Sequence, residues 1–318
     1  MARHMGSSSS ASNKTVHMAA SVEEPLSNHA VNPLPSHAGG VNGLPSQKPN
    51  RGSKGRRIFS TLLLAVGIVL LLVAGGMFAV QQWGYYQQDK VNSDLAAHVK
   101  IDDAPSQGSE VEKCPVTVDW AALKKVNDEV VGWLYVPGTT INYPIYQHSD
   151  NEYYLHNNAE GTWTVGGQLF MDYENTKPGL VDNQSLIYGH HLLNGTMFEQ
   201  IAALDDQKKF DEMGTIWYVT EQGAHRLKPV FMYDTAREDM DARTINFASA
   251  DELHKFLAKR LDKALTRRAD ADKIVSKVDH VMTLSTCIYY SKYEKGQGRG
   301  LLVCAPVEEI DAALAATK

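Results

Sequence analysis

The longest hydrophobic segment of the chain, IFSTLLLAVGIVLLLVAGGMFAV, covers residues 58–80 and contains no charged residue. As a helix that rises ~1.5 Å per residue, it is long enough to cross a hydrocarbon core of about 30 Å. Basic residues gather just before it and the uncharged aromatic stretch QQWGYYQQ follows it, so the N-terminus is expected to be cytoplasmic. A cleaved signal peptide is the alternative, but the segment is longer than a typical signal core and lies far from the N-terminus. The pattern predicts a single-pass plasma-membrane protein with an uncleaved signal anchor.

The segments on either side of this anchor are polar. Residues 1–57 are rich in Ser, Asn, Pro, Gly and Ala and contain no Phe, Trp or Tyr, so they cannot bury enough surface to form a core. They are predicted to be a disordered cytoplasmic tail. Residues 81–116 have the mixed polar composition of an extracellular stalk, residues 117–310 have the pattern of a folded domain, and residues 311–318 are predicted to be a C-terminal tail.

The folded domain begins with helical spacing at Trp120, Leu123 and Val126 and then changes to short apolar segments separated by clusters of Gly, Asn, Asp and Pro. Many short strands at short spacing favour a mostly β barrel or sandwich. The predicted strands are GWLYV, INYPIY, GGQLFMDY, QSLIYG, GTIWYVT, HRLKPVFMY, HVMTLST and RGLLVCA.

One predicted helix precedes the last two strands. Ser249 and Glu252 have the spacing of a capping box, and apolar residues then recur every three or four positions as far as Leu265. Basic residues up to Arg268 gather at its end, where the helix dipole favours them. We assign this helix a structural role.

Charge and cysteine content limit the possible partners and cofactors of the chain. Residues 1–57 hold seven of the 31 Lys and Arg residues but two of the 37 Asp and Glu residues, so the rest of the chain carries a formal charge of −11. Such a surface repels polyanions, which argues against a nucleic acid partner. The spacing of Asp and His residues predicts no metal site, and no cofactor is expected. Cys114, Cys287 and Cys304 are an odd number, so at least one thiol stays unpaired even in an oxidising exterior.

Cys287 ends the strand segment VMTLSTC, where a cysteine is either a small core residue or a nucleophile presented at a sheet edge. His190 and His191 follow the strand QSLIYG directly, and histidine is the usual neighbour that favours a thiolate. Arg299 opens the strand after Cys287, and the two strands would form a long hairpin that places Arg299 across from the cysteine. There the guanidinium is either an exposed charge or a group that stabilises a thiolate or an oxyanion.

The order of IYGHHLLNGTMF, TLSTC and a strand-start arginine resembles the sortases of Gram-positive bacteria. The segments VGWLYVPGTTINYPIYQHSDNEYYL and GGQLFMDYEN resemble their class B branch, and the resemblance covers about residues 116–308. It implies an eight-stranded sortase-type β-barrel with an N-terminal helix and a helix before the last two strands. The catalytic residues that it implies are His190, Cys287 and Arg299. The residues expected to bind substrate beside them are Tyr188, Ser285 and Thr286.

Three further positions, His191, Gly300 and Cys304, lie outside the implied catalytic set. His191 takes the variable position after the family's GH, and it is expected to project away from Cys287 because successive residues of an extended segment point to opposite sides. Gly300 stands where the family pattern leads us to expect a larger strand residue. Cys304 either pairs with Cys114 or remains a buried thiol.

The resemblance implies a membrane-anchored cysteine transpeptidase. Cys287 would attack a threonine carbonyl in the C-terminal sorting signal of a surface protein, and His190 would protonate the departing amine. Arg299 would orient the substrate and stabilise the oxyanion, and the thioester would pass to an amine of a peptidoglycan precursor or a pilin.

Two other classes of exported protein are considered. Another cysteine peptidase or an L,D-transpeptidase-like wall enzyme is disfavoured, because His190 precedes Cys287 and no SHGC-like run occurs. A non-catalytic, membrane-anchored assembly domain would require the loss of His, Cys or Arg, and all three are present.

Overall fold

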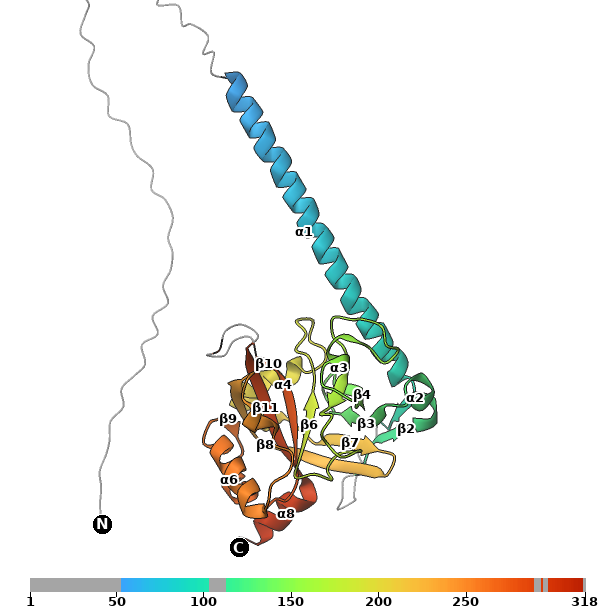
Figure 1. The fold of residues 1–318 in the computed structure, drawn as a ribbon, viewed down its shortest axis with the longest axis vertical. Coiled ribbons are helices and arrows are strands. Elements are labelled where there is room, and N and C mark those ends of the chain that lie inside the picture. The colour runs from blue at the N-terminus through green and yellow to red at the C-terminus, as the bar shows by residue number, and fades with distance from the viewer. Residues whose placement is uncertain (1–52, 103–112, 289–292, 294–296, 317–318) are drawn as a thin grey trace, which may run out of the picture. The chain divides into compact units, whose positions relative to one another are not determined.

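A computed structural model of the protein describes residues 53–102, 113–288, 293 and 297–316 (Figure 1). The chain divides into two units, residues 1–61 and residues 62–318. Apart from residues 53–57, the predicted cytoplasmic tail lies outside the described residues.

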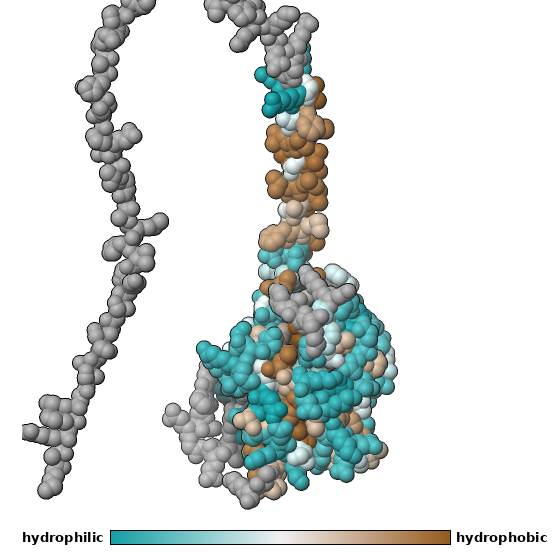
Figure 2. All heavy atoms as spheres, turned by 90° about the vertical axis from the view of Figure 1, so that its left-hand side faces the viewer, coloured by the Kyte–Doolittle hydropathy of each residue, from teal (hydrophilic) through white to brown (hydrophobic). Residues whose placement is uncertain are grey.

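Helix α1 (Ser53–Ala96) contains the predicted anchor and is long and apolar enough to cross a membrane. Its hydrophobic side chains form the brown segment of Figure 2. Large side chains such as Leu64 and Leu71 remain exposed along it. An exposed apolar helix of this length matches the predicted transmembrane segment.

Eight strands form a closed β-barrel, which confirms the expected fold. Strand β8 pairs with both β7 and β11, and the pairing with β11 closes the ring. In ring order the strands are β11 (Gly298–Pro306), β10 (Val281–Ile288), β6 (Gln184–Tyr188), β5 (Leu169–Met171), β4 (Asn142–Tyr146), β3 (Val130–Tyr135), β7 (Ile216–Thr220) and β8 (Gly223–Ala236). They correspond to the eight predicted strand segments.

Alternate side chains of these strands fill the barrel. Leu284 of β10 and Leu302 of β11 are fully buried in the interior cluster, together with Ile187 of β6. Val281 and Leu301 belong instead to a cluster on the outer face, where helices α6 (Ala250–Leu261) and α7 (Ala271–Val275) pack. On β10 and β11, even-numbered residues therefore face the interior and odd-numbered residues face outward.

The remaining helices are short. They are α2 (Trp120–Val126), α3 (Tyr153–His156), α4 (Glu199–Ala202), α5 (Gln207–Glu212), α8 (Val307–Ala315) and the 3-10 segments η1 (Ala203–Asp205) and η2 (Met240–Arg243). Helix α2 is the predicted N-terminal helix, and the Asp119 side chain caps it by accepting from the Ala122 N–H.

Helix α6 begins as predicted, because the Ser249 side chain accepts from the Glu252 N–H. Its predicted extension to Leu265 is wrong: the helix ends at Leu261, and the following residues form a ninth strand, β9 (Ala264–Arg267), beside β8. Strand β8 is longer than its partner β7, and its remaining edge provides the backbone groups with which β9 pairs.

The ends of the domain extend further than the sequence indicated. Within residues 81–116, predicted as a stalk, the structure describes the last turns of α1 and the strand β1 (Val99–Ile101), which pairs with β2 (Val116–Val118). Leu95 is buried against the outer face of the barrel, in the same cluster as Trp133. At the other end, α8 includes most of the predicted C-terminal tail, because Ala313 is buried.

The three cysteines are free in the structure, so the Cys114–Cys304 disulfide is not formed. Cys304 is fully buried in the interior cluster, whereas Cys114 lies beside the cluster that contains Trp133. Burial raises the pKa of the Cys304 thiol, which keeps it protonated and unreactive.

Gly300, the departure from the family pattern, lies in a regular part of β11 opposite Thr286. A Cβ atom there would come within 2.7 Å of Ile288 Cδ1 and 2.8 Å of Met232 Cε. The absence of a side chain at Gly300 thus leaves room for Ile288 and Met232 in the barrel interior. The pairing of β10 with β11 continues without interruption through Gly300 to Arg299.

Gly300→Leu should lower the free energy of unfolding by about 1–3 kcal/mol, because the added side chain overpacks the barrel interior. Urea unfolding of the exported domain measures this effect. Gly214→Leu is the matched control, since a Cβ at Gly214 meets no atom within 4 Å. Equal losses in the two variants would contradict the packing explanation.

Candidate active site

The pairing of β10 with β11 places Cys287 directly opposite Arg299. Directly opposed residues of an antiparallel pair have side chains on the same face, and both residues are odd-numbered, so both point to the outer face. Cys287 and Arg299 are each partly exposed. The structure therefore brings a reachable thiol and a guanidinium together at the end of the hairpin.

Strand β6 brings the histidine to the same place. It runs parallel to β10, with Tyr188 beside Ser285, and the Gly189 N–H donates to the Ser285 carbonyl at 3.0 Å. His190 lies two residues beyond Tyr188, just as Cys287 lies two residues beyond Ser285. The two-residue period puts His190 on the outer face at the level of Cys287.

Gly189 is required for this approach. A Cβ atom at this position would lie 2.5 Å from Leu169 Cδ2 and 2.6 Å from Phe198 Cδ2. Since both contacts are with buried core residues, any side chain would push the end of β6 away from the barrel. Packing thus explains why glycine precedes His190 in the GH motif.

The His190 ring is held by the main chain of α3. Its Nε2 lies 2.7 Å from the Leu155 carbonyl oxygen. A carbonyl can only accept, so Nε2 carries the proton in this contact and Nδ1 is the nitrogen that can exchange a proton with a reacting group.

The surroundings of His190 set its charge. Burial lowers the pKa of the imidazole most, the Leu155 carbonyl raises it by favouring the protonated form, and Coulombic interactions with His156 and Arg299 lower it. The net direction is downward, so the ring is mainly neutral at pH 7. A neutral ring can accept a proton from an adjacent group such as a thiol.

His191 contacts the main chain of Cys287, a contact that the expected alternation of side chains did not include. Its side chain is buried, and Nδ1 donates to the Cys287 carbonyl oxygen at 3.0 Å. The alternation of side chains still separates the two rings, because His191 contacts the main chain of Cys287 from beside Ile288, whereas His190 shares the outer face with the thiol. A hydrogen bond across elements, which local alternation does not reveal, explains the difference.

The residues expected to bind substrate fall into two groups. Tyr188 and Ser285 lie on the outer face with the thiol, Tyr188 half-buried and Ser285 buried. Thr286 points to the barrel interior, is 2% exposed, and its hydroxyl has no hydrogen-bond partner among the described residues. The register therefore separates the Thr286 side chain from the reacting face.

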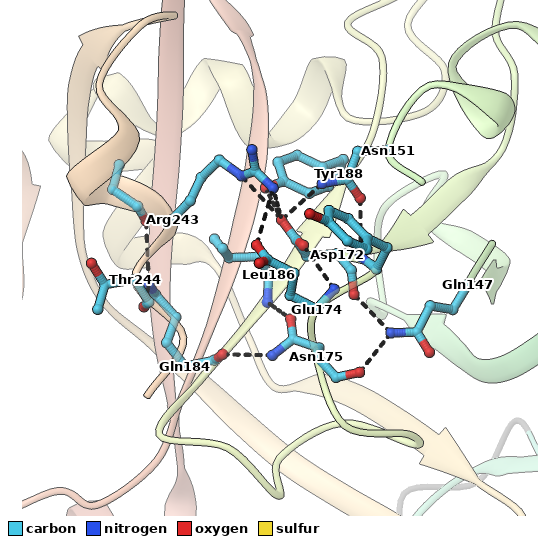
Figure 3. Close-up of polar contacts among 12 residues, drawn as sticks. Gln147, Asn151, Asp172, Glu174, Asn175, Gln184, Leu186, Tyr188, Arg243 and Thr244 are labelled. Atoms are coloured by element: carbon cyan, nitrogen blue, oxygen red, sulfur yellow. Dashed lines mark hydrogen bonds and ion pairs between the residues drawn. The ribbon is translucent and has the colours of Figure 1, made fainter. Parts of the chain in front are cut away.

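A buried carboxylate underlies this face (Figure 3). Asp172 is fully buried, and its Oδ2 accepts from the Tyr188 hydroxyl at 2.7 Å and from Arg243 at 3.0 Å. The Asn151 amide donates to the same oxygen at 3.0 Å. Burial, together with the Asp172 charge, raises the pKa of Tyr188 and keeps its hydroxyl a donor.

Sequence reasoning missed Leu155, His156, Asp172 and Arg243. Leu155 and Asp172 lie in the motifs EYYL and MDYEN that carry the class B resemblance, so the motifs pointed to their segments without indicating a role. Leu155 acts through its carbonyl, which residue type does not encode. Arg243 is 71 residues from Asp172, and only the fold brings them together.

The described residues contain no group of three or more His, Cys, Asp and Glu side chains placed to hold a metal ion. Cys287, His190 and Arg299 instead offer a thiol, an imidazole and a guanidinium, which are groups that can act as nucleophile, proton carrier and cation. This set of groups is suited to acyl transfer through a thioester.

Comparison with known proteins gives a consistent result. Residues 134–307 match the family model described as the sortase domain. Sortase B of Listeria monocytogenes is 30% identical over 238 residues, which cover 73% of this chain and 94% of the relative. Sortase B of Staphylococcus aureus is 28% identical over 225 residues, or 71% and 88% of the two chains.

Solved structures show the same fold. Sortase B from Bacillus anthracis in complex with AAEK1 matches with a TM-score of 0.56 and 28% identity, covering 71% of this chain and 98% of the other. A Staphylococcus aureus sortase B–substrate complex matches with a TM-score of 0.51 and 26% identity, covering 59% of this chain and 84% of the other. A sortase B complexed with triglycine matches with the same TM-score and coverage at 25% identity.

The charge balance at His190 gives a test of the site geometry. His156→Gln should raise the pKa of His190, because it removes the neighbouring imidazole whose Coulombic interaction disfavours the His190 imidazolium. Histidine NMR titration measures the shift. His254→Gln removes a distant imidazole bonded to the Val278 carbonyl and should leave the titration unchanged. An unchanged or lower pKa in His156→Gln would contradict the proposed electrostatics.

Proposed function

The chain belongs to the sortase family, and we propose that it is a membrane-anchored, class B-like enzyme that cleaves a C-terminal sorting signal after threonine. As a cysteine transpeptidase, it would transfer the acyl part to an amine of a peptidoglycan precursor or a pilin. The observation that carries this proposal is the pairing of Cys287 with Arg299 on the face that His190 shares.

The first half of the reaction forms the thioester. The Cys287 thiol first gives its proton to Nδ1 of the neutral His190 ring. The resulting thiolate attacks the threonine carbonyl carbon, and the oxyanion that develops lies near Arg299. The amide C–N bond then breaks as Nδ1 of the His190 imidazolium gives its proton to the departing amine. Nε2–H stays bound to the Leu155 carbonyl during this step, so the ring keeps its orientation.

The second half reverses the roles. The acceptor amine attacks the thioester carbonyl, and neutral His190 takes a proton from it as a general base. The C–S bond breaks, an amide forms, and the Cys287 thiolate is regenerated. The substrate complex and the triglycine complex of related sortase B enzymes support an acyl substrate and an amine acceptor for this chain.

The membrane placement is also part of the proposal. Residues 58–80 would span the plasma membrane with the N-terminus in the cytoplasm and the catalytic domain outside. The support is the apolar stretch of α1 and the basic residues that precede it. An anchored enzyme would meet surface-protein substrates and a lipid-linked acceptor at one membrane face.

Cys287→Ala should abolish both signal cleavage and transfer, because no other group can form the thioester. Mass spectrometry of a peptide that bears a sorting signal, incubated with and without triglycine, measures both activities. Cys304→Ala is the matched control: it removes a buried thiol and should leave turnover intact. Retained turnover in Cys287→Ala would contradict the mechanism.

The two histidines should differ strongly. His190→Ala should lower kcat/KM by at least about 10²–10⁴-fold, the usual contribution of general acid–base catalysis. His191→Asn can still donate to the Cys287 carbonyl. This variant should lower kcat/KM far less, by about tenfold, which corresponds to a barrier higher by ~1.4 kcal/mol. Circular dichroism checks the folding of each variant. Equal losses would require the proton carrier to be reassigned.

A further inference from the structure

Helix α1 does not end where its apolar segment ends. It continues through Ala96, and its later turns pack on the barrel domain. The Gln88 side chain is fully buried and its Nε2 donates to the Gly167 carbonyl at 2.9 Å. A Cβ atom at Gly84 would lie 3.5 Å from Val165 Cγ1. Helix α1 therefore packs directly on the barrel domain, and these contacts begin shortly after the apolar segment ends.

A hollow of about 420 Å³ lies between these turns of α1 and the hairpin of residues 157–165. Val80 and Trp83 line it from the helix, and Trp163 and Val165 line it from the hairpin. Trp163 is 66% exposed and Trp83 is 62% exposed. Two tryptophans exposed beside one hollow are unusual on a surface that contacts water alone.

The spacing along α1 gives the depth of this hollow. Val80 ends the apolar segment, and Gly84, which faces Val165, lies four residues later. At ~1.5 Å per residue this separation is about 6 Å along the helix. A headgroup layer is about 5–8 Å thick on each side of the hydrocarbon core. With residues 58–80 spanning the membrane, the Trp163 hairpin would be level with the headgroups, where Trp and Tyr are enriched in membrane proteins.

The hairpin is also joined to the active site. Asn157 pairs with Trp163, and the Thr164 N–H donates to the His156 carbonyl at 2.8 Å. Directly before His156 lies Leu155, whose carbonyl accepts from His190. The residues that hold the His190 ring and the exposed Trp163 thus belong to one short, hydrogen-bonded segment.

We propose that the Trp163 hairpin is a second membrane contact, which binds phospholipid of the outer leaflet beside the anchor and keeps the His190 side of the active site close to the bilayer. The inference rests on the proposed membrane anchoring. The occupant of the hollow is lipid, because the hollow is continuous with Val80, the last residue of the membrane segment. In this arrangement a lipid-linked acceptor reaches the thioester without leaving the membrane surface.

Fluorescence quenching tests the contact. The full-length protein is placed in phosphatidylcholine vesicles that carry bromine near the headgroup end of the acyl chains, which quenches adjacent tryptophans. With Trp83→Phe as the background, quenching should persist and should disappear when Trp163→Phe is added. Trp120→Phe in the same background is the matched control and should retain it, while Trp133 and Trp217 are buried. Quenching that does not depend on Trp163 would overturn the proposal.

Two further measurements separate the possible failures. In Trp163→Phe alone, quenching of Trp83 reports the anchor; if Trp83 is not quenched, both the anchor and the second contact are wrong. If Trp83 is quenched and Trp163 is not, only the second contact is wrong. Transfer to soluble triglycine should be unchanged in Trp163→Phe, because Trp163 does not belong to the active site. A loss of this transfer activity would overturn the proposal that Trp163 acts only through the membrane.

Discussion

The site depends on the double pairing of β10, which is held between a parallel neighbour, β6, and an antiparallel neighbour, β11. The first pairing sets His190 level with Cys287, and the second sets Arg299 opposite it. A slip of one residue in either pairing would turn the corresponding side chain to the barrel interior. The closed ring resists such slips, because each strand has a partner on both sides and the interior positions are filled with large apolar residues.

Buried polar groups then orient the side chains that the register has placed. The Leu155 carbonyl fixes one nitrogen of His190, and His191 bonds the main chain of Cys287. Deeper in the face, Asp172 collects hydrogen bonds from Tyr188 and Arg243. Removing one partner from such a buried charged network costs several kcal/mol, because the remaining group stays desolvated. Burial also lowers the pKa of His190 and so favours the neutral form of its ring.

The path from the end of the apolar segment of α1 to the His190 ring is short in this molecule. From Gly84 on α1 to the Val165 side chain, and from Thr164 to His156 and Leu155, only a few contacts separate the end of the apolar segment from the His190 ring. In the proposed membrane-anchored enzyme, this short connection would limit the orientations that the active site can take above a bilayer. For a reaction between two anchored partners, restricting orientation reduces the entropy that must be lost before reaction.

Local sequence pattern was sufficient for the features that arise within one segment of the chain. An uncharged apolar run predicts a membrane helix, and alternating apolar segments between turn residues predict the eight barrel strands. The resemblance to sortases pointed to His190, Cys287 and Arg299 as the catalytic candidates, and the strand pattern placed them at or just beyond strand ends. Other features depend on long-range contacts and emerged only from the folded chain: the end of α6 at Leu261 and the strand β9, the folding of residues near Leu95 onto the barrel, and the free state of Cys304. The fold also turned Thr286 inward, gave His191 its bond to Cys287, and assembled Asp172 with Arg243. These contacts join residues far apart in the chain, and local periodicity contains no information about such pairs.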